Sequence, residues 1–176
     1  MQYIILLRGV NVGGRTIKMA ALKSCFEENG YQNVQTILQT GNVIVQANEK
    51  NIAKLQKKAE AELTAAFNYP AKVLALTPEQ LENIVRQYAF TNIDAGFHRY
   101  IVFTENGFEK QLVKDCGVLD KNMEAVKAGA GVVYWCVQKG YTLDSAFGKY
   151  MNKMAVKHFI TNRNVNTLEK ILAKCG

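Results

Sequence analysis

The chain has 176 residues, of which 48% are hydrophobic and 21% are charged, with 2 Pro and 13 Gly. This composition excludes a disordered chain, a collagen and a pure coiled coil, and the length allows one domain or two small ones. The 22 Lys and Arg against 15 Asp and Glu give a mildly basic net charge of +7.

The first half of the chain predicts the order β-α-β-β-α-β. Its opening segment is apolar without alternation, which is typical of a strand buried on both faces, and Gly41-Asn42 is a tight-turn dipeptide. The expected elements are a strand at 3–7, a helix at 19–26 that stops by Gly30, strands at 34–40 and 43–46, a helix at 52–67 and a strand at 73–76. This order is that of a ferredoxin-like unit.

The second half predicts a looser echo, β-α-β-β-α with a terminal helix. The expected elements are a helix capped by Thr77 that runs to 88, a strand at 100–104, a short helix at 107–117, a hairpin of 124–128 and 132–137, and helices at about 146–159 and 166–175. We therefore expect an α+β protein with a ferredoxin-like subdomain at 1–76 and a related second α+β subdomain at 77–176.

No segment of the sequence predicts export, a membrane span or a cofactor. The apolar run near the start covers five residues without a basic region before it, so we expect a strand there and a cytoplasmic protein. The four cysteines are far apart and form no C-x-x-C pair, which indicates reduced, buried side chains. With only two histidines we expect no metal site and no cofactor.

Two polar segments that contain glycine are expected to meet at one edge of the first sheet. In a β-α-β-β-α-β unit the end of the first strand lies beside the start of the third. We call segments 8–14 and 39–42 the rim, because glycines there allow backbone N–H groups to face an anion. The candidate ligand-binding residues of the rim are Arg8, Asn11, Gly13, Gly14, Gln39, Thr40, Gly41 and Asn42.

Residues 9–16 also resemble a phosphate-binding loop, although three features disfavour that interpretation. Arg15 stands where the motif has lysine, and the helical pattern starts only near Lys18 or Met19. The next two strands form a hairpin rather than a parallel sheet. The alternative for the rim as a whole is that its glycines only permit turns.

Basic residues also gather near the C-terminus. Residues 1–76 and 141–176 each carry a net charge of +4, whereas residues 77–140 carry −1. Lys149, Lys153 and Lys157, which we call the lysine row, recur every four residues in the 146–159 helix. Arg163 and Asn164 precede the last helix, for which Asn166 and Glu169 resemble a capping box. The predicted anion-binding patch is Lys149, Lys153, Lys157, Arg163 and Asn164; a plain solvated face is the alternative.

These segments together resemble a known family. The sequence resembles the uncharacterised bacterial family called domain of unknown function 1697 at 7–14, at Lys18-Met19 and Leu22, at 39–43 and at 163–170, with Val165 where the family often has Trp. The resemblance implies a small cytosolic α+β protein in two subdomains. It implies no reaction, cofactor or catalytic residue.

The leading hypothesis for function is non-catalytic binding of a phosphate-bearing ligand, foremost nucleic acid, at the rim and the C-terminal patch. One alternative is a small-molecule enzyme with its pocket at the rim, and another is a protein-interaction module. The central strands of the first subdomain carry only Tyr3 as an aromatic residue, which argues against an RNA-recognition sheet. No catalytic signature is present in the sequence.

Overall fold

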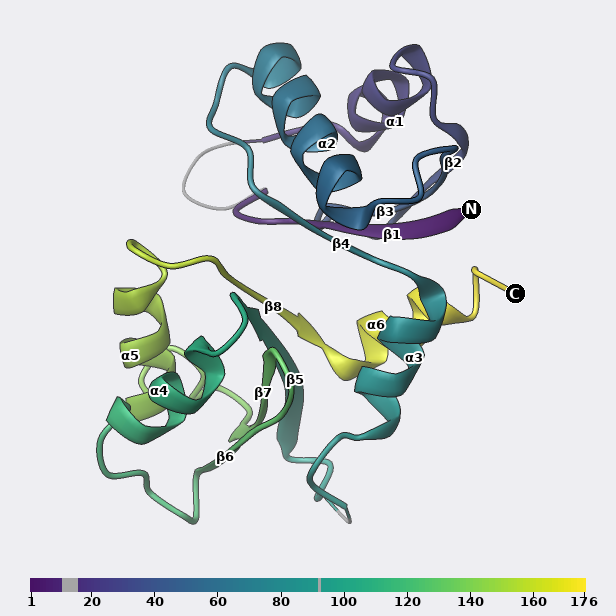
Figure 1. Cartoon of the computed structure of the whole chain (residues 1–176). Helices are drawn as coiled ribbons and strands as arrows, with labels where there is room; N and C mark the ends of the chain where they lie inside the picture. The colour runs from purple at the N-terminus through teal and green to yellow at the C-terminus, as the bar shows by residue number, and fades with distance from the viewer. Residues whose placement is uncertain (11–15, 92) are drawn as a thin grey trace. The chain divides into compact units, whose positions relative to one another are not determined.

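A computed structural model describes residues 1–10, 16–91 and 93–176 (Figure 1). The chain divides into two units, which are residues 1–83 with 170–176 and residues 84–169. Residues 77–83 and 170–176, expected in the second subdomain, therefore group with the first unit. In the part of the chain that is described, no helix is both long and apolar enough to cross a membrane.

The first unit has the expected ferredoxin-like arrangement. Its strands are β1 (Gln2–Leu7), β2 (Gln32–Ile37), β3 (Asn42–Gln46) and β4 (Val73–Leu76), and its helices α1 (Met19–Glu28) and α2 (Ile52–Phe67) lie on one face of the sheet (Figure 1). The sheet is antiparallel with the order β2-β3-β1-β4. Five of the six β1 residues are buried, as the unbroken apolar run predicts.

Local polar residues define the helix ends of this unit. Asn51 caps α2 by accepting a hydrogen bond from the Lys54 N–H (3.1 Å). Helix α3 (Pro78–Arg86) begins at the predicted cap, because Thr77 and Gln80 exchange side-chain to backbone hydrogen bonds of 2.9 and 3.2 Å. The prediction that Thr77 starts this helix is confirmed.

The second unit repeats the strand order of the first. Its elements are β5 (Phe97–Thr104), α4 (Phe108–Asp115), β6 (Glu124–Ala128), β7 (Val132–Gln138), α5 (Ala146–Met154), β8 (Ile160–Asn164) and the start of α6 (Val165–Leu172). The antiparallel order β6-β7-β5-β8 corresponds strand for strand to that of the first sheet. The echo is therefore closer than the sequence predicts.

Strand β8 corrects the predicted C-terminal region. The helix expected to reach residue 159 ends at Met154, whose carbonyl accepts hydrogen bonds from the N–H groups of both Lys157 and His158 (3.0 Å each). Residues 160–164, expected to connect the last two helices, pair instead with β5, from Thr104↔Ile160 to Tyr100↔Asn164. The second unit is thus β-α-β-β-α-β, as is the first.

A buried carboxylate ties the second sheet to its helices. Glu124 is 3% exposed, and its two oxygens accept hydrogen bonds from Trp135 Nε1 (3.1 Å) and the Phe147 N–H (3.3 Å). The second bond lies in the first turn of α5, where the helix dipole stabilises a negative charge. Ser145 caps the same helix through the Gly148 N–H (3.0 Å).

Candidate functional site

The described part of the rim, residues 8–10 and 39–42, lies together at one edge of the first sheet. Leu6 pairs with Asn42 across β1 and β3, and the Leu7 N–H donates to the Gly41 carbonyl (2.8 Å). The Arg8 N–H donates to the Lys72 carbonyl of the segment before β4 (2.9 Å), and the Arg8 side chain is half-buried. Three predicted rim residues, Asn11, Gly13 and Gly14, lie outside the described residues.

Gly41 allows the close approach of the rim segments. Its φ of +69° lies in the left-handed region, and a Cβ at this position would lie 2.9 Å from Leu7 Cβ and 3.2 Å from Val10 Cβ. Only a residue without a side chain fits both constraints. The glycine therefore has a structural reason to be there, whatever the rim binds.

The turn before β3 is longer than the predicted two residues. Strand β2 ends at Ile37 rather than at Thr40, and residues 38–41 form the turn, with Leu38 also at a positive φ of 58°. Asn42 belongs to β3 and is fully buried, and its Nδ2 donates to the Ile37 carbonyl (3.0 Å) and to Thr40 Oγ1 (2.8 Å). The polar atoms of Asn42 thus hold the turn together, which places Gln39 and Thr40 at the surface.

A cavity of about 540 Å³ opens beside this turn. It is lined by Thr16, Ile17, Lys18, Met19, Gln39 and Thr40. Four of these side chains carry polar groups that can donate a hydrogen bond, and Lys18 adds a positive charge. The described lining contains no carboxylate, so the cavity has the chemistry of an anion site.

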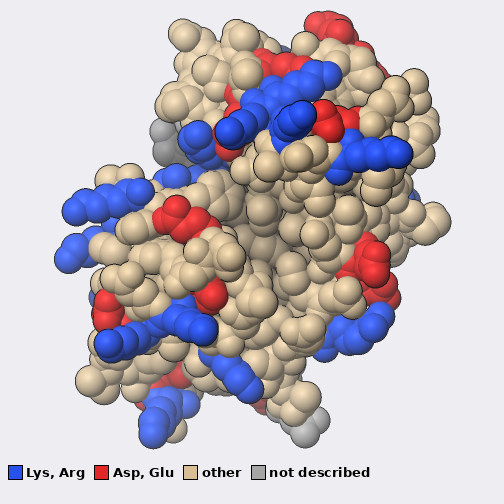
Figure 2. All heavy atoms as spheres, in the orientation of Figure 1, with Lys and Arg blue, Asp and Glu red and all other residues tan. Residues whose placement is uncertain are grey.

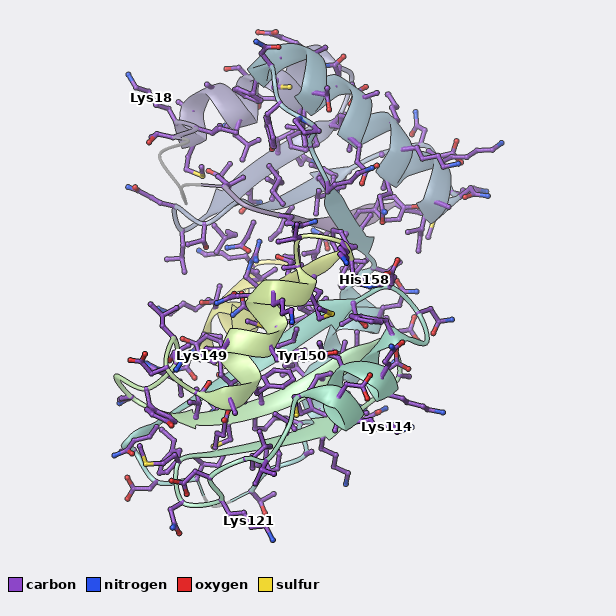
Figure 3. All side chains as sticks on the ribbon, turned by 90° about the vertical axis from the view of Figure 1, so that its left-hand side faces the viewer. Lys18, Lys114, Lys121, Lys149, Tyr150 and His158 are labelled. Atoms are coloured by element: carbon purple, nitrogen blue, oxygen red, sulfur yellow. The ribbon has the colours of Figure 1, made fainter. Side chains whose placement is uncertain are left out.

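The N-terminus of α1 adds to this chemistry. Lys18 occupies the N-cap position with extended backbone (φ −66°, ψ 133°), and its side chain makes no capping hydrogen bond. The first turn contains no acidic side chain. The first-turn N–H groups and the positive end of the helix dipole therefore favour an anion there. Figure 3 shows Lys18 at this end of α1.

The phosphate-loop interpretation does not fit the observed elements. Helix α1 begins at Met19, so Thr16 precedes it instead of lying on its first turn. β1 is flanked by antiparallel strands on both sides, and β3 follows β2 through a turn. A phosphate loop instead places its Lys-Thr pair on the first turn of the helix and follows a strand of a parallel sheet.

The lysine row is only partly helical. Lys149 and Lys153 lie on α5, and Lys157 lies beyond the helix end; all three are exposed. Lys149 Nζ is 3.9 Å from Asp144 Oδ1, and acidic atoms lie beside the basic atoms on the α5 side of the second unit (Figure 2). Figure 3 shows Lys149 on α5 and His158 beyond the helix end.

Arg163 and Asn164 occupy other positions than expected. Arg163 lies on β8 and is 8% exposed; its Nη1 donates to Thr161 Oγ1 (2.9 Å) and to the Asn162 carbonyl (2.8 Å). Burial lowers the pKa of this guanidinium to about 10, so it stays charged at neutral pH. Asn164 Oδ1 accepts from the Asn166 N–H (2.9 Å), so Asn164 caps α6 and the predicted capping box at Asn166 is wrong. Arg163 therefore does not extend the exposed lysine row.

The second unit contains two further cavities, which the sequence did not predict. They are lined by residues from 88–99, by Lys139 and by the segment at Asn164 and Asn166. Strand β8 places Asn164 in this lining, and because the sequence did not predict β8, it did not predict the cavities either. The one signal in the sequence was the aromatic and basic content of 88–99.

The four cysteines are free, as predicted. Cys25, Cys116 and Cys136 are buried, and Cys175 is partly exposed. Burial is the main cause that raises the pKa of each of these thiols above its ordinary value. A thiol with a raised pKa is a poor nucleophile at neutral pH, so none of the four has the character of a catalytic cysteine.

Comparison with solved structures shows the same fold in a bacterial protein. The structure of the conserved bacterial protein SP0830 from Streptococcus pneumoniae is similar over 99% of this chain and 97% of its own, with a TM-score of 0.80 and 23% identity. An unknown protein from Galdieria sulphuraria matches with a TM-score of 0.27 and 8% identity over 93% of this chain and 97% of its own, which is too little to inform on the fold. No curated protein matches the chain.

The sequence itself matches one family model. The match covers residues 1–134, which include both rim segments and α1, whereas the motif at 163–170 lies outside the matched range. The match covers more than half of the chain, and its range contains the Leu7–Gly14 and Gln39–Val43 segments on which the resemblance rests. The chain therefore belongs to the family described as protein of unknown function, DUF1697.

Proposed function

We propose that this protein binds a compact phosphate-bearing ligand at the rim of its first unit. The observation that carries the proposal is the cavity of about 540 Å³ at the uncapped N-terminus of α1, with Lys18 in its wall. A phosphate there would accept hydrogen bonds from first-turn N–H groups, from the Lys18 ammonium and from the Thr16 hydroxyl. The cavity volume is in the range of small-molecule sites.

The surface charge favours a compact ligand over a nucleic acid. A polymer site needs a continuous row of cations along the phosphate backbone. Three lysines of the first unit lie beside acids: Lys23–Glu27, Lys58–Glu62 and Lys72–Glu60 are 3.4 to 3.6 Å apart. Figure 2 shows basic and acidic atoms interleaved over α2. Neighbouring acids therefore offset part of the positive charge there.

Titration of the labelled protein with inorganic phosphate tests this proposal by amide NMR. We expect the amide signals of residues 19–21 to shift, because these first-turn N–H groups would face the anion, whereas the Leu22 N–H donates to the Lys18 carbonyl (3.0 Å). Lys18→Gln should weaken binding roughly tenfold, since a hydrogen bond to a charged group contributes about 1.5–3 kcal/mol. Thr16→Val, which removes only the hydroxyl, should weaken it less.

Lys23→Gln is the matched control, because Lys23 lies on the same helix and outside the cavity lining. It should leave the phosphate affinity within about twofold of the unmodified protein. Equal losses in Lys18→Gln and Lys23→Gln would mean that only the net charge matters, and the proposed site would be wrong. An absence of shifts at 19–21 would reject the proposed site directly.

A further inference from the structure

Two cavities in the second unit share part of their lining and differ in character. The first, of about 380 Å³, is lined by Tyr88, Phe90, Thr91, Ile93 and Arg99. The second, of about 550 Å³, shares Ile93 and Arg99 with the first and adds polar groups from the ends of β7 and β8. One half is therefore aromatic and the other half polar.

The aromatic half has a fixed wall. The Tyr88 hydroxyl donates to the Trp135 carbonyl (2.8 Å), and its ring packs edge-on against Tyr134, with centroids 5.7 Å apart at 80°. Phe90 packs edge-on against Tyr88, with centroids 5.8 Å apart at 74°. Burial raises the pKa of Tyr88, so its phenol stays protonated and keeps this hydrogen bond. Such a wall suits a planar ring.

Arg99 stands at the junction of the two halves. Its Nη2 donates to Asn166 Oδ1 (2.8 Å) and lies 3.7 Å from Glu169 Oε1, and its guanidinium carbon is 6.0 Å from the Tyr88 ring centroid. These contacts hold the head group in place while its side chain remains 37% exposed. The other guanidinium donors make no hydrogen bond to a described residue, so they are available to an anion.

The polar half supplies further donors. Lys139 adds a second positive charge at its wall, beside His98 and Asn164. The Lys139 backbone N–H donates to the Gly96 carbonyl (2.8 Å), which holds the backbone of this residue against the loop before β5. The acid in this lining, Asp94, already accepts a hydrogen bond from the Gly96 N–H (2.6 Å). The polar half thus presents two cations to a ligand.

We infer that these two cavities together bind a planar ring that carries a phosphate, the chemistry of a mononucleotide. The ring packs against Tyr88 and Phe90, and the phosphate lies between Arg99 and Lys139. Aromatic side chains stack with any base, and an arginine fork matches the phosphate oxygens. The site is distinct from the rim cavity and does not depend on the proposed function there.

Amide NMR titrations with adenosine 5′-monophosphate, adenosine and inorganic phosphate test the inference. Adenosine 5′-monophosphate should shift residues 88–99 and 139 and bind at least tenfold more tightly than either adenosine or phosphate, with a Kd between about 10 µM and 1 mM. Equal affinity for the nucleotide and for phosphate would reject the ring contact. Shifts confined to 16–22 and 39–40 would reject this site and leave the rim proposal intact.

Two variants separate the halves of the site. Lys139→Gln should weaken the nucleotide roughly tenfold and leave adenosine unchanged, because only the phosphate contacts Lys139. Phe90→Ala should weaken both the nucleotide and adenosine by roughly tenfold, since stacking on one ring is lost. Lys127→Gln, an exposed lysine of β6 outside the cavities, is the control and should change neither. If Lys127→Gln lost as much affinity for the nucleotide as Lys139→Gln, the inference would be overturned.

Discussion

At the scale of single residues, some rim residues hold the turn before β3 together, and others lie at its surface. Gly41 and Asn42 both look like turn residues in the sequence, yet Asn42 is fully buried and bonded within the turn. Gly41 lies against Leu7 and Val10. Gln39 and Thr40 are the exposed members of the same segment. The first two residues therefore set the shape of the turn.

Gly41→Ala tests this division. The new Cβ would lie 2.9 Å from Leu7 Cβ at a φ of +69°, so we expect a loss of about 2–4 kcal/mol in the free energy of unfolding. Gly30→Ala is the matched control, with a φ of +86° and open space around the added atom, and should cost only about 1–2 kcal/mol. Urea denaturation measures both. Equal losses would show that the contact with Leu7 contributes nothing.

Residue patterns predicted the meeting of the rim segments but not the roles of their side chains. The meeting follows from the strand order, which hydrophobic patterning is sufficient to indicate. Whether Asn42 points into the turn or toward a ligand depends on the length of the turn. The observed turn has four residues where two were predicted, and its first and last residues, Leu38 and Gly41, both have positive φ. No pattern in the sequence marks Leu38 for that conformation.

At the scale of elements, the short polar strands were the hardest to predict. β8 reads Ile-Thr-Asn-Arg-Asn, which has few apolar side chains and no clear alternation. Its pairing with β5 over five residues gives it strand structure. The strand structure of β8 depends on a partner that is distant in sequence, so local propensity does not predict it. By contrast β1 and β7 are buried along almost their whole length and were predicted within one residue at each end.

Helices α1 and α2 together bury a cluster of titratable groups that makes folding depend on pH. Burial is the main cause that raises the pKa of Glu62 above its ordinary value of 4.5, and Lys58, 3.6 Å away, opposes that rise. Burial and the Glu62 charge also raise the pKa of Tyr31, over whose ring Lys58 lies (4.9 Å). A carboxyl with a raised pKa binds its proton more tightly in the folded chain. The folded state therefore loses stability as the pH rises from 4.5 through the raised pKa.

Glu62→Gln should remove this pH-dependent loss of folded-state stability. The variant should show a smaller fall in unfolding free energy between pH 4.5 and 7, because the amide carries no charge to desolvate. Glu27→Gln is the control, since Glu27 forms the same type of pair with Lys23 (3.6 Å) at an exposed position. Urea denaturation across that pH range, with all three proteins, gives the comparison. A Glu62→Gln profile parallel to that of the unmodified protein would contradict the role of burial.

At the scale of the whole molecule, one topology occurs twice without a visible sequence repeat. Both sheets have the same antiparallel strand order, and each has its own buried core. The core of the first unit contains β1, β3, α1 and α2 residues, and that of the second is centred on Trp135, Phe147 and Phe108. Apolar spacing at period 2 and 3.6 is enough to specify the same architecture twice. The candidate sites differ because the polar residues at the sheet edges differ.

The net charge of +7 allows a last test of nucleic acid as a ligand. Ion pairs neutralise part of the positive surface, and the lysine row is short, so duplex DNA should bind weakly. We expect a log–log dependence of affinity on salt with a slope shallower than about −3, which corresponds to roughly three phosphate contacts. Changing Lys149, Lys153 and Lys157 together to Gln should alter that slope by less than about one. Fluorescence anisotropy from 25 to 200 mM salt, about the range where such slopes are resolved, gives the measurement. A slope near −5 or steeper that flattens in the triple variant would instead make nucleic acid the ligand and the lysine row its site.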